Sequence, residues 1–387
     1  MTSSPTTNYQ SPIPNKRVAL VTDWITEDGG GEKVVEQFHA LYPEAPIYTS
    51  YCNPAWNTRL NNKVMTGYLQ HWPFSALRRF LPVLRQRWFA RLDLSQFDVI
   101  ISITGNGEAK FVRKNSQQLH LSYCHTPVHF YWAQYEEYVK HPSMRPKWLA
   151  RLGLQLLVTP LRKKDFAAAQ KVDFFMANSS AIRDDIKTYY QRDSEVVFPP
   201  VDTSHFIQLC PAEKKRTIPQ NPRCLWWSRV VPAKKVDVLV EACNQLGWPL
   251  AIVGDGPDLP RLKILAKSNI SFLGYISDEE RDQLIQQADL FLYASKEDFG
   301  ITPVEALAAG LPVVAYGAGG ALDYVQPGKN GELFASQTAA SLVDVLSTLP
   351  GTSYDTAYIA ASAERFSVAK FRQRVGDFVQ KHTGGQI

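Results

Sequence analysis

The stretch SKEDFGITPVE, residues 295–305, joins a strand-like run to a helix-like run, and this junction is the most informative part of the chain. LFLYAS (290–295) leads into it and PVEALAAG (303–310) leads out of it. An apolar strand followed at once by a helix is the repeating unit of a parallel sheet covered by helices. The junction therefore lies at the carboxyl end of a strand, the edge where such sheets bind ligands.

Two glutamates flank this junction. Glu297 is expected on the loop beyond the strand, and Glu305 in the first turn of the helix. Between them, the backbone amides of Phe299, Gly300 and Ile301 are expected to face a crevice that suits anions. One carboxylate can accept hydrogen bonds from sugar hydroxyls, and the amides can bind a phosphate. The other carboxylate can accept hydrogen bonds from a ribose. This layout predicts a nucleotide-sugar site.

A purely structural interpretation of the same residues is also open. Thr302, Pro303 and Glu305 fit a capping box, with Thr302 as N-cap, Pro303 at the first helical position and Glu305 reaching back. Glu297 alone would be an ordinary exposed loop acid. The functional interpretation therefore depends on agreement with other parts of the chain.

Strand-like and helix-like runs alternate in two blocks, separated by a proline-bearing polar stretch that predicts a linker. Such blocks predict an α/β fold of two Rossmann-like domains facing across a cleft. The expected divisions are a disordered tail (1–15), a first domain (16–200), the linker (201–222) and a second domain (223–366).

Composition narrows the class of protein. With 387 residues, 45% of them hydrophobic and 20% charged, the chain fits a soluble protein with a sizeable core. No apolar run approaches the ~18 residues that a membrane span needs. The five cysteines form no CxxC pair, which favours reduced thiols and a cytoplasmic location.

Two segments, 78–91 and 145–164, combine basic side chains with aromatic and aliphatic ones. Such segments suit peripheral contact with anionic lipid, here at the inner face of a membrane. An ordinary amphipathic helix with its basic face in water is an equal alternative. No recognition motif for nucleic acid accompanies the charge, so a nucleic-acid partner is not expected.

Cations also follow the strand-like run RCLWWS (223–228). Arg229 comes directly after it, and Lys234 and Lys235 lie just beyond. Two such cations could clamp a diphosphate and stabilise the charge on a departing nucleotide. Adjacent lysines ahead of a helix are, however, usually just solvated.

Glycines and one histidine stand at other strand ends. Gly30, Gly31 and Gly254 lie in turns whose amides can approach a phosphate or a sugar closely. His125, in YCHTP, could hydrogen-bond a sugar hydroxyl, although a lone histidine is more often structural. Without a DxD motif or metal-ligand spacing, we expect no metal and no cofactor. Positive charge must then come from side chains and helix ends.

Together these residues resemble a retaining glycosyltransferase of family 4, which has the GT-B fold. The resemblance runs from Arg17 to about Glu364. Ser228 and Lys235 stand where the family usually has glycine, which leaves open whether Lys234 or Lys235 contacts the diphosphate. The motifs that carry the resemblance are EDFGITPVEALAAGLPVVAYGAGGALDYV (297–325), SRVVPAKKVD (228–237), YCHTP (123–127) and GGGEKVV (29–35).

The resemblance implies a role for each matching residue and a C-terminal segment, 367–387, that returns to the first domain. Glu297 would bind the hydroxyls of the donor sugar and Glu305 the ribose. Arg229 and Lys234 would hold the diphosphate, with amides from Phe299, Gly300 and Ile301. His125 would touch the transferred sugar, and Gly30 and Gly31 would lie near the donor phosphates and the acceptor.

Within the family, the sequence of residues 297–325 looks most like that of bacterial O-antigen mannosyltransferases. That likeness implies transfer of mannose from GDP-mannose to a lipid-linked glycan, with retained configuration and without a metal. One alternative is a UDP-glucose transferase that acts on a small soluble sugar or sugar phosphate, as in sucrose-phosphate synthesis. Another is a non-catalytic sugar-nucleotide binder. Donor, acceptor, linkage and oligomeric state stay open at this point.

Overall fold

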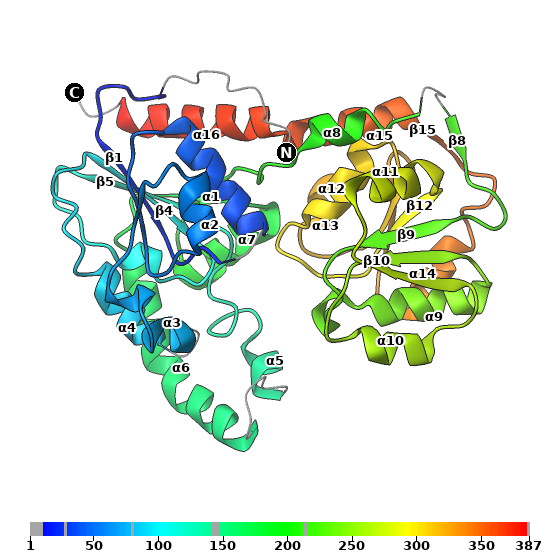
Figure 1. The fold of residues 1–387 in the computed structure, drawn as a ribbon, viewed down its shortest axis with the longest axis horizontal. Helices are drawn as coiled ribbons and strands as arrows, with labels where there is room; N and C mark the ends of the chain where they lie inside the picture. The colour runs from blue at the N-terminus through cyan, green and yellow to red at the C-terminus, as the bar shows by residue number, and fades with distance from the viewer. Residues whose placement is uncertain (1–10, 27–28, 79–80, 141–146, 212–214, 385–387) are drawn as a thin grey trace. The chain divides into compact units, whose positions relative to one another are not determined.

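The computed structural model describes residues 11–26, 29–78, 81–140, 147–211 and 215–384. The chain divides into two compact units (Figure 1). Unit 1 comprises Met1–Pro199 with Phe371–Ile387, and unit 2 comprises Pro200–Lys370. Each unit is built on its own parallel sheet with helices packed on it, so the expectation of two Rossmann-like domains is confirmed.

The described residues of unit 1 form a seven-stranded sheet in the order β3-β2-β1-β4-β5-β6-β7. All neighbouring strands run parallel. The strand order reverses between β1 and β4, which is the position where α/β sheets open a crevice at their carboxyl edge. The strands are β1 Val18–Thr22, β2 Ile47–Thr49, β3 Val64–Met65, β4 Val99–Thr104, β5 Leu119–Cys124, β6 Phe174–Ala177 and β7 Ser194–Val196.

Helices cover this sheet because each carries an apolar stripe. In α1, Val34, Val35 and Phe38 are buried at helical spacing against the sheet. A π-helical turn at 186–190 extends α7. The helices of unit 1 are α1 Gly30–Leu41, α2 Pro54–Arg59, α3 Phe74–Leu77, α4 Pro82–Phe89, α5 Tyr135–Lys140, α6 Lys147–Ala169, α7 Ser180–Asp185 and most of α16 Val368–Thr383.

The C-terminal helix α16 belongs to the core of unit 1. Phe371, Val375 and Phe378 are buried among residues of α1 and the sheet. The ring of Phe371 meets those of Phe38 and Tyr123 edge-on, with centroids 5.6 and 5.8 Å apart. The chain therefore returns to unit 1 at its end, as the family resemblance implied.

The described residues of unit 2 form a six-stranded parallel sheet in the order β11-β10-β9-β12-β13-β14. Here the order reverses between β9 and β12. The strands are β9 Cys224–Trp227, β10 Leu250–Val253, β11 Ile270–Gly274, β12 Leu290–Tyr293, β13 Val313–Tyr316 and β14 Gly331–Phe334. The helices are α8 Thr203–Ile207, α9 Val236–Leu246, α10 Leu259–Leu265, α11 Asp278–Gln287, α12 Ile301–Ala308, α13 Ala321–Tyr324, α14 Ala339–Leu346 and α15 Thr356–Ala363.

The stretch 201–222, expected to be a linker, contains α8 and the strand β8 Lys215–Thr217, both within unit 2. Strand β8 pairs antiparallel with β15 Ser353–Asp355. Phe206 of α8 is buried, with the Arg281 guanidinium 5.2 Å from its ring. A few buried side chains thus anchor a segment whose overall composition is that of a linker.

The expected disordered tail, 1–15, is ordered over its last part. Ile13 is buried in the core of unit 1. The Gln380 side chain donates a hydrogen bond to the Pro12 carbonyl at 3.1 Å. Residues 1–10 lie outside the described residues. A short apolar anchor within a polar tail gives no periodic signal, which is why the sequence did not reveal it.

Candidate functional site

The loops that follow β9 and β12 bring two predicted site residues together at the carboxyl edge of the unit 2 sheet. The ammonium of Lys234 forms an ion pair with the carboxylate of Glu297. The Ser295 hydroxyl donates to the Lys234 carbonyl at 3.1 Å, which fastens the two loops to each other. The Lys234 and Glu297 side chains are 16% and 28% exposed, so a ligand can reach both.

Lys234, and not Lys235, is the lysine that meets Glu297. Lys234 ends a short 3-10 turn, Pro232–Lys234. Lys235 is exposed and takes the N-cap position of α9 with a φ of 51°. The backbone therefore directs the two neighbouring side chains differently, and the structure favours Lys234 as the lysine of the site.

The pKa of Lys234 is lowered to about 8, chiefly because burial removes its ammonium from water and further because the Arg229 guanidinium lies near. The Glu297 carboxylate acts in the opposite sense, since an opposite charge favours the ammonium. Lys234 is thus mainly cationic near neutral pH and loses its charge under mildly alkaline conditions. An incoming anion would meet two cations, one partly buried and one exposed.

Gly300 shapes the turn between the two predicted carboxylates. Its φ is 89°, a conformation that favours glycine. A Cβ there would lie 2.9 Å from the Tyr293 hydroxyl and 3.0 Å from the Tyr324 hydroxyl. Phe299 is buried, and its ring packs against Tyr324 and Phe366 at centroid distances of 5.7 and 5.5 Å. The amides of Gly300 and Ile301 thus stand at the start of α12, where helical N–H groups have no partner within the helix.

The capping-box interpretation of Glu305 is wrong. Helix α12 begins at Ile301 with Gly300 as N-cap, and no side chain caps it. Glu305 consequently lies in the second turn rather than the first. Its Oε2 accepts a hydrogen bond from the Trp227 indole Nε1 at 3.1 Å. The positive φ of Gly300 lets the helix start before Thr302, and this frees the carboxylate from a capping role.

Gly319 and Gly320, within the motif that carries the family resemblance, hold the Glu297 loop in place. The Gly320 amide donates to the Glu297 carbonyl at 2.9 Å. A Cβ on Gly319 would lie 2.1 Å from the same carbonyl oxygen. The GAGG run, 317–320, was the available signal, because consecutive glycines permit this close backbone approach.

Gly254 follows β10, and its backbone closely approaches that of Ser228, which follows β9. Its φ is 117°, and a Cβ there would be 2.0 Å from the Ser228 carbonyl oxygen. Its amide donates to the Gly274 carbonyl at 2.8 Å. The amide of this predicted donor-binding residue is therefore used within the protein, and the glycine is required by packing.

The predicted residues of unit 1 gather at the carboxyl edge of its own sheet. Gly30 and Gly31 open α1, and His125 follows β5. A Cβ on Gly31 would lie 3.9 Å from His125 Nε2. The His125 amide donates to the Thr104 carbonyl at 2.8 Å, which fixes the backbone beneath the ring.

Asp23, at the end of β1, was not singled out from the sequence. Its buried carboxylate accepts from the Thr104 hydroxyl and from the amides of Gly105, Asn106 and Ala109, at 2.6–2.9 Å. It thus holds the loop after β4, and no residue type around it signals this role.

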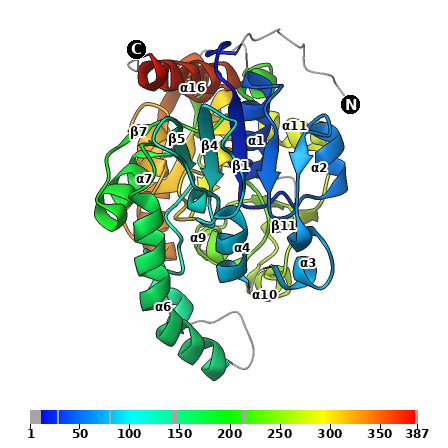
Figure 2. The ribbon, with the colours of Figure 1, turned by 90° about the vertical axis from the view of Figure 1, so that its left-hand side faces the viewer.

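The two basic segments differ in the structure. In α4, Trp88 and Phe89 are buried in the core, and Arg85 forms a buried ion pair with Glu108 at 2.6 Å. The aromatic side chains of α4 are therefore core residues and are not available for the membrane contact predicted for 78–91; 79–80 lie outside the described residues. The segment 145–164 is described from Lys147 on, and Trp148, Leu152, Leu156 and Leu157 in it are exposed. Figure 2 shows the helix α6 that carries them.

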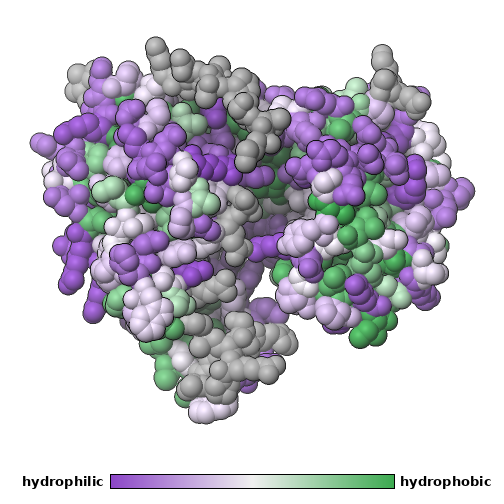
Figure 3. Space-filling view, viewed as in Figure 1, coloured by the Kyte–Doolittle hydropathy of each residue, from purple (hydrophilic) through white to green (hydrophobic). Residues whose placement is uncertain are grey.

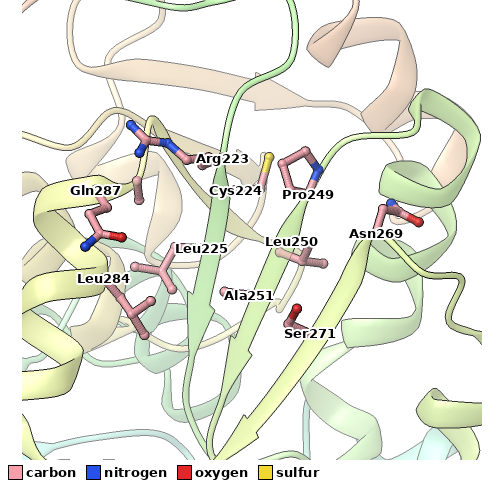
Figure 4. Close-up of a pocket in the computed structure, with 11 residues that line it drawn as sticks. Arg223, Cys224, Leu225, Pro249, Leu250, Ala251, Asn269, Ser271, Leu284 and Gln287 are labelled. Carbon is pink, nitrogen blue, oxygen red and sulfur yellow. The ribbon is translucent and has the colours of Figure 1, made fainter.

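A cavity of about 160 Å³ opens at the amino edge of the unit 2 sheet, where β9, β10 and β11 begin (Figure 4). Leu225, Leu250, Ser271 and Leu284 are among its lining residues. None of the predicted site residues lines it. Within the described residues, no cluster of three or more His, Cys, Asp or Glu could hold a metal, and no helix is long and apolar enough to span a bilayer.

Comparison with known proteins supplies the family. The sequence profile described as "Glycosyl transferases group 1" matches residues 212–350. The alpha-1,3/1,6-mannosyltransferase alg2 of Schizosaccharomyces pombe is 31% identical over 401 aligned positions, which cover 89% of this chain and 76% of that protein. The chain belongs to the group 1 glycosyltransferases.

One further relative matches a shorter part of this chain, and a solved structure matches nearly all of it at lower sequence identity. A GDP-mannose-dependent alpha-(1-6)-phosphatidylinositol monomannoside mannosyltransferase of Mycobacterium tuberculosis is 30% identical, over 40% of this chain and 46% of its own. This chain thus matches slightly less than half of the length of that relative. The crystal structure of Anabaena Alr3699/HepE in complex with UDP has a TM-score of 0.65 at 20% identity, covering 94% of this chain and 100% of that one. At that identity the likeness concerns the GT-B fold.

Proposed function

We propose that this glycosyltransferase moves mannose from GDP-mannose to a hydroxyl of a lipid-linked glycan, with retained configuration and without a metal. The observation that carries the proposal is the accessible Lys234–Glu297 ion pair beside Arg229. The names of the mycobacterial and yeast relatives support mannose as the sugar, and the first of them supports GDP as the nucleotide.

A nucleotide diphosphate sugar offers a new partner to each member of this pair. The diphosphate can take over the Lys234 ammonium together with Arg229, and the sugar hydroxyls can donate to the Glu297 carboxylate. Every charge then keeps a partner, so the exchange leaves no buried ion unpaired. The amides at the start of α12 add hydrogen-bond donors for phosphate. Glu305 would accept a hydrogen bond from a ribose hydroxyl, while the indole of Trp227 holds the Glu305 carboxylate in place.

In the proposed reaction the acceptor oxygen bonds to the anomeric carbon from the face that the leaving group occupies. The bond from that carbon to the diphosphate oxygen breaks, and the acceptor proton passes to the diphosphate. Arg229 and Lys234 stabilise the charge that develops on the leaving group, an effect worth about 3–4 kcal/mol for a well-placed donor. The other carried-over roles, for His125 with the transferred sugar and for Gly30 and Gly31 with donor phosphate and acceptor, remain part of this proposal.

The test is donor hydrolysis and thermal stabilisation of the purified protein with GDP-mannose, UDP-glucose and ADP-glucose, each with and without a chelator. GDP-mannose should raise the melting temperature and be hydrolysed slowly without an acceptor. Stabilisation by UDP-glucose alone would favour the transferase that acts on a small soluble sugar. Stabilisation without hydrolysis or transfer would favour a non-catalytic binder, and activity lost reversibly to the chelator would contradict the metal-independent route.

A further inference from the structure

Helix α6, Lys147–Ala169, has two halves with different surroundings. Val158, Leu161, Asp165 and Ala168 are buried, so the second half packs onto unit 1. Of the side chains described between 147 and 157, which leave out 149 and 150, none is buried. Figure 2 shows this first half of α6 running away from the sheet of its unit.

The exposed half carries an apolar stripe. Trp148, Leu152 and Leu156 follow one another at intervals of four residues, which places them on one face of the helix. They are 68%, 45% and 67% exposed, and the adjacent Leu157 is 57% exposed. From Trp148 to Leu156 the stripe extends about 12 Å along the helix axis. A contiguous exposed apolar row of this kind marks an interaction surface.

The charges that α6 itself carries beside the stripe have one sign. Residues 147–164 contain Lys147, Arg151, Arg162, Lys163 and Lys164 and no acidic residue. Arg151 and Arg162 donate to backbone carbonyls of unit 1, whereas Lys147, Lys163 and Lys164 are exposed. Lys163 continues the face of the stripe, because fifteen residues from Trp148 bring the helix back to about the same side. The neighbouring α5 adds Glu136, Glu137 and Lys140, which leaves both helices together with an excess of cations.

We propose that this stripe, Trp148, Leu152 and Leu156, inserts into the interfacial layer of an anionic lipid bilayer, while Lys147, Lys163 and Lys164 contact lipid phosphates. An apolar face with lysine-rich flanks and tryptophan is the pattern of a helix that lies in a membrane interface. Charge complementarity selects an anionic bilayer over a zwitterionic one. The inference rests on the proposed function in one respect: a lipid-linked acceptor gives the enzyme a reason to bind the membrane that holds the acceptor.

The experiment is sedimentation of the full-length protein with vesicles of phosphatidylcholine, with and without phosphatidylglycerol. The wild type should bind the vesicles that contain phosphatidylglycerol and lose that binding at high salt. The double variant Trp148→Glu/Leu156→Glu should bind at least about tenfold more weakly, because it replaces apolar contacts with charges that the lipid repels. Ile264→Glu is the matched control, since Ile264 on α10 of unit 2 is 85% exposed. Figure 3 shows hydrophobic residues gathered on the lower part of unit 2, where Figure 1 draws α9 and α10.

Equal vesicle binding by the double variant and the wild type, or binding lost equally in Ile264→Glu, would overturn the proposal. Failure of the wild type to bind anionic vesicles would do the same. Light scattering in the absence of lipid adds another outcome. A wild type that is dimeric and a double variant that is monomeric would assign the stripe to contact with a second copy and contradict the lipid assignment. Donor hydrolysis is measured on the same samples, because an active variant that no longer binds vesicles separates this inference from the proposed function.

Discussion

Two lysine–carboxylate ion pairs, one in each unit, differ in their access to water. Lys234 and Glu297 in unit 2 remain partly exposed. Lys110 and Asp165 in unit 1 are each 1% exposed. The Lys110 ammonium also donates to the Gly107 carbonyl at 3.1 Å and to the Tyr190 hydroxyl at 3.2 Å, and Asp165 accepts from the Trp132 indole at 2.8 Å.

The difference separates charges that hold a fold from charges that can bind a ligand. Around Lys110 and Asp165 the protein itself supplies the hydrogen-bonding partners, and removal of one charge would strand the other in a medium of low dielectric. The Lys234–Glu297 pair lies at the carboxyl edge of a parallel sheet and can exchange partners with a ligand. Residue types alone would not distinguish these pairs, whereas burial does.

The largest effect should come from Lys110→Met. This change leaves Asp165 buried without its cation and should lower the stability of unit 1 by about 3–5 kcal/mol. Chemical unfolding followed by circular dichroism measures it, and activity should fall only as the folded fraction falls. The double change Lys110→Met/Asp165→Leu should recover part of the loss. A stable Lys110→Met protein would remove the distinction between the two pairs.

Lys234→Ala and Glu297→Ala should have the reverse pattern. Loss of the Lys234 ammonium, which stabilises the leaving charge, or of the Glu297 carboxylate, which positions the donor sugar, should reduce transfer by about a hundredfold to a thousandfold. Stability should change by less than about 1 kcal/mol, since partly exposed pairs contribute little. Steady-state transfer rates and unfolding curves of the same preparations give both numbers. Normal turnover in either folded variant would refute the assignment of the site.

The pH dependence should distinguish the pairs through the lowered pKa of Lys234, about 8. Below this pH the ammonium is protonated and can bind the diphosphate; above it the charge is lost. The ratio kcat/KM for the donor, which reports the free enzyme, should therefore fall by about tenfold per pH unit above 8. Lys234→Arg, which keeps its charge, should extend activity to higher pH. A fall at the same pH in both proteins would assign the titration to another group.

The smallest effect should come from Trp227→Phe. The change removes the hydrogen bond to Glu305 and should raise the donor KM by about fivefold, equivalent to about 1 kcal/mol. Trp226→Phe is the control, because within the described residues the Trp226 indole nitrogen is buried with no hydrogen-bond partner. It should lower stability through lost packing and leave the donor KM unchanged. Equal KM values for both variants would separate Glu305 from donor binding.

The fold could be predicted because its signal is spread along the chain. Runs such as 97–103 and 290–295 are predominantly apolar, as expected of strands buried on both faces. The boundaries of the two units were harder to predict from the sequence. Ile13 and Phe206 anchor polar segments through single buried side chains, and the pairing of β8 with β15 joins residues far apart in sequence.

For the candidate site, sequence placed the charges at the right strand ends but not their partners. The start of α12 depends on the φ of Gly300, so the capping role expected for Glu305 failed. Asp23 acts through backbone amides, which leave no trace in residue types. Helix α4 and the first half of α6 both combine basic with large apolar side chains, yet Trp88 and Phe89 of α4 are buried and Trp148 of α6 is exposed. Composition does not specify which face meets a core.

The most direct test of the central claim is calorimetric titration of GDP into the wild type, Lys234→Ala and Lys235→Gln, with a chelator present throughout. Assignment of the diphosphate to Lys234 and Arg229 predicts binding by the wild type without a metal. It also predicts affinity about a hundredfold weaker for Lys234→Ala, about 2.7 kcal/mol, and an unchanged affinity for Lys235→Gln. Unchanged binding by Lys234→Ala, or wild-type binding that requires a divalent cation, would contradict it.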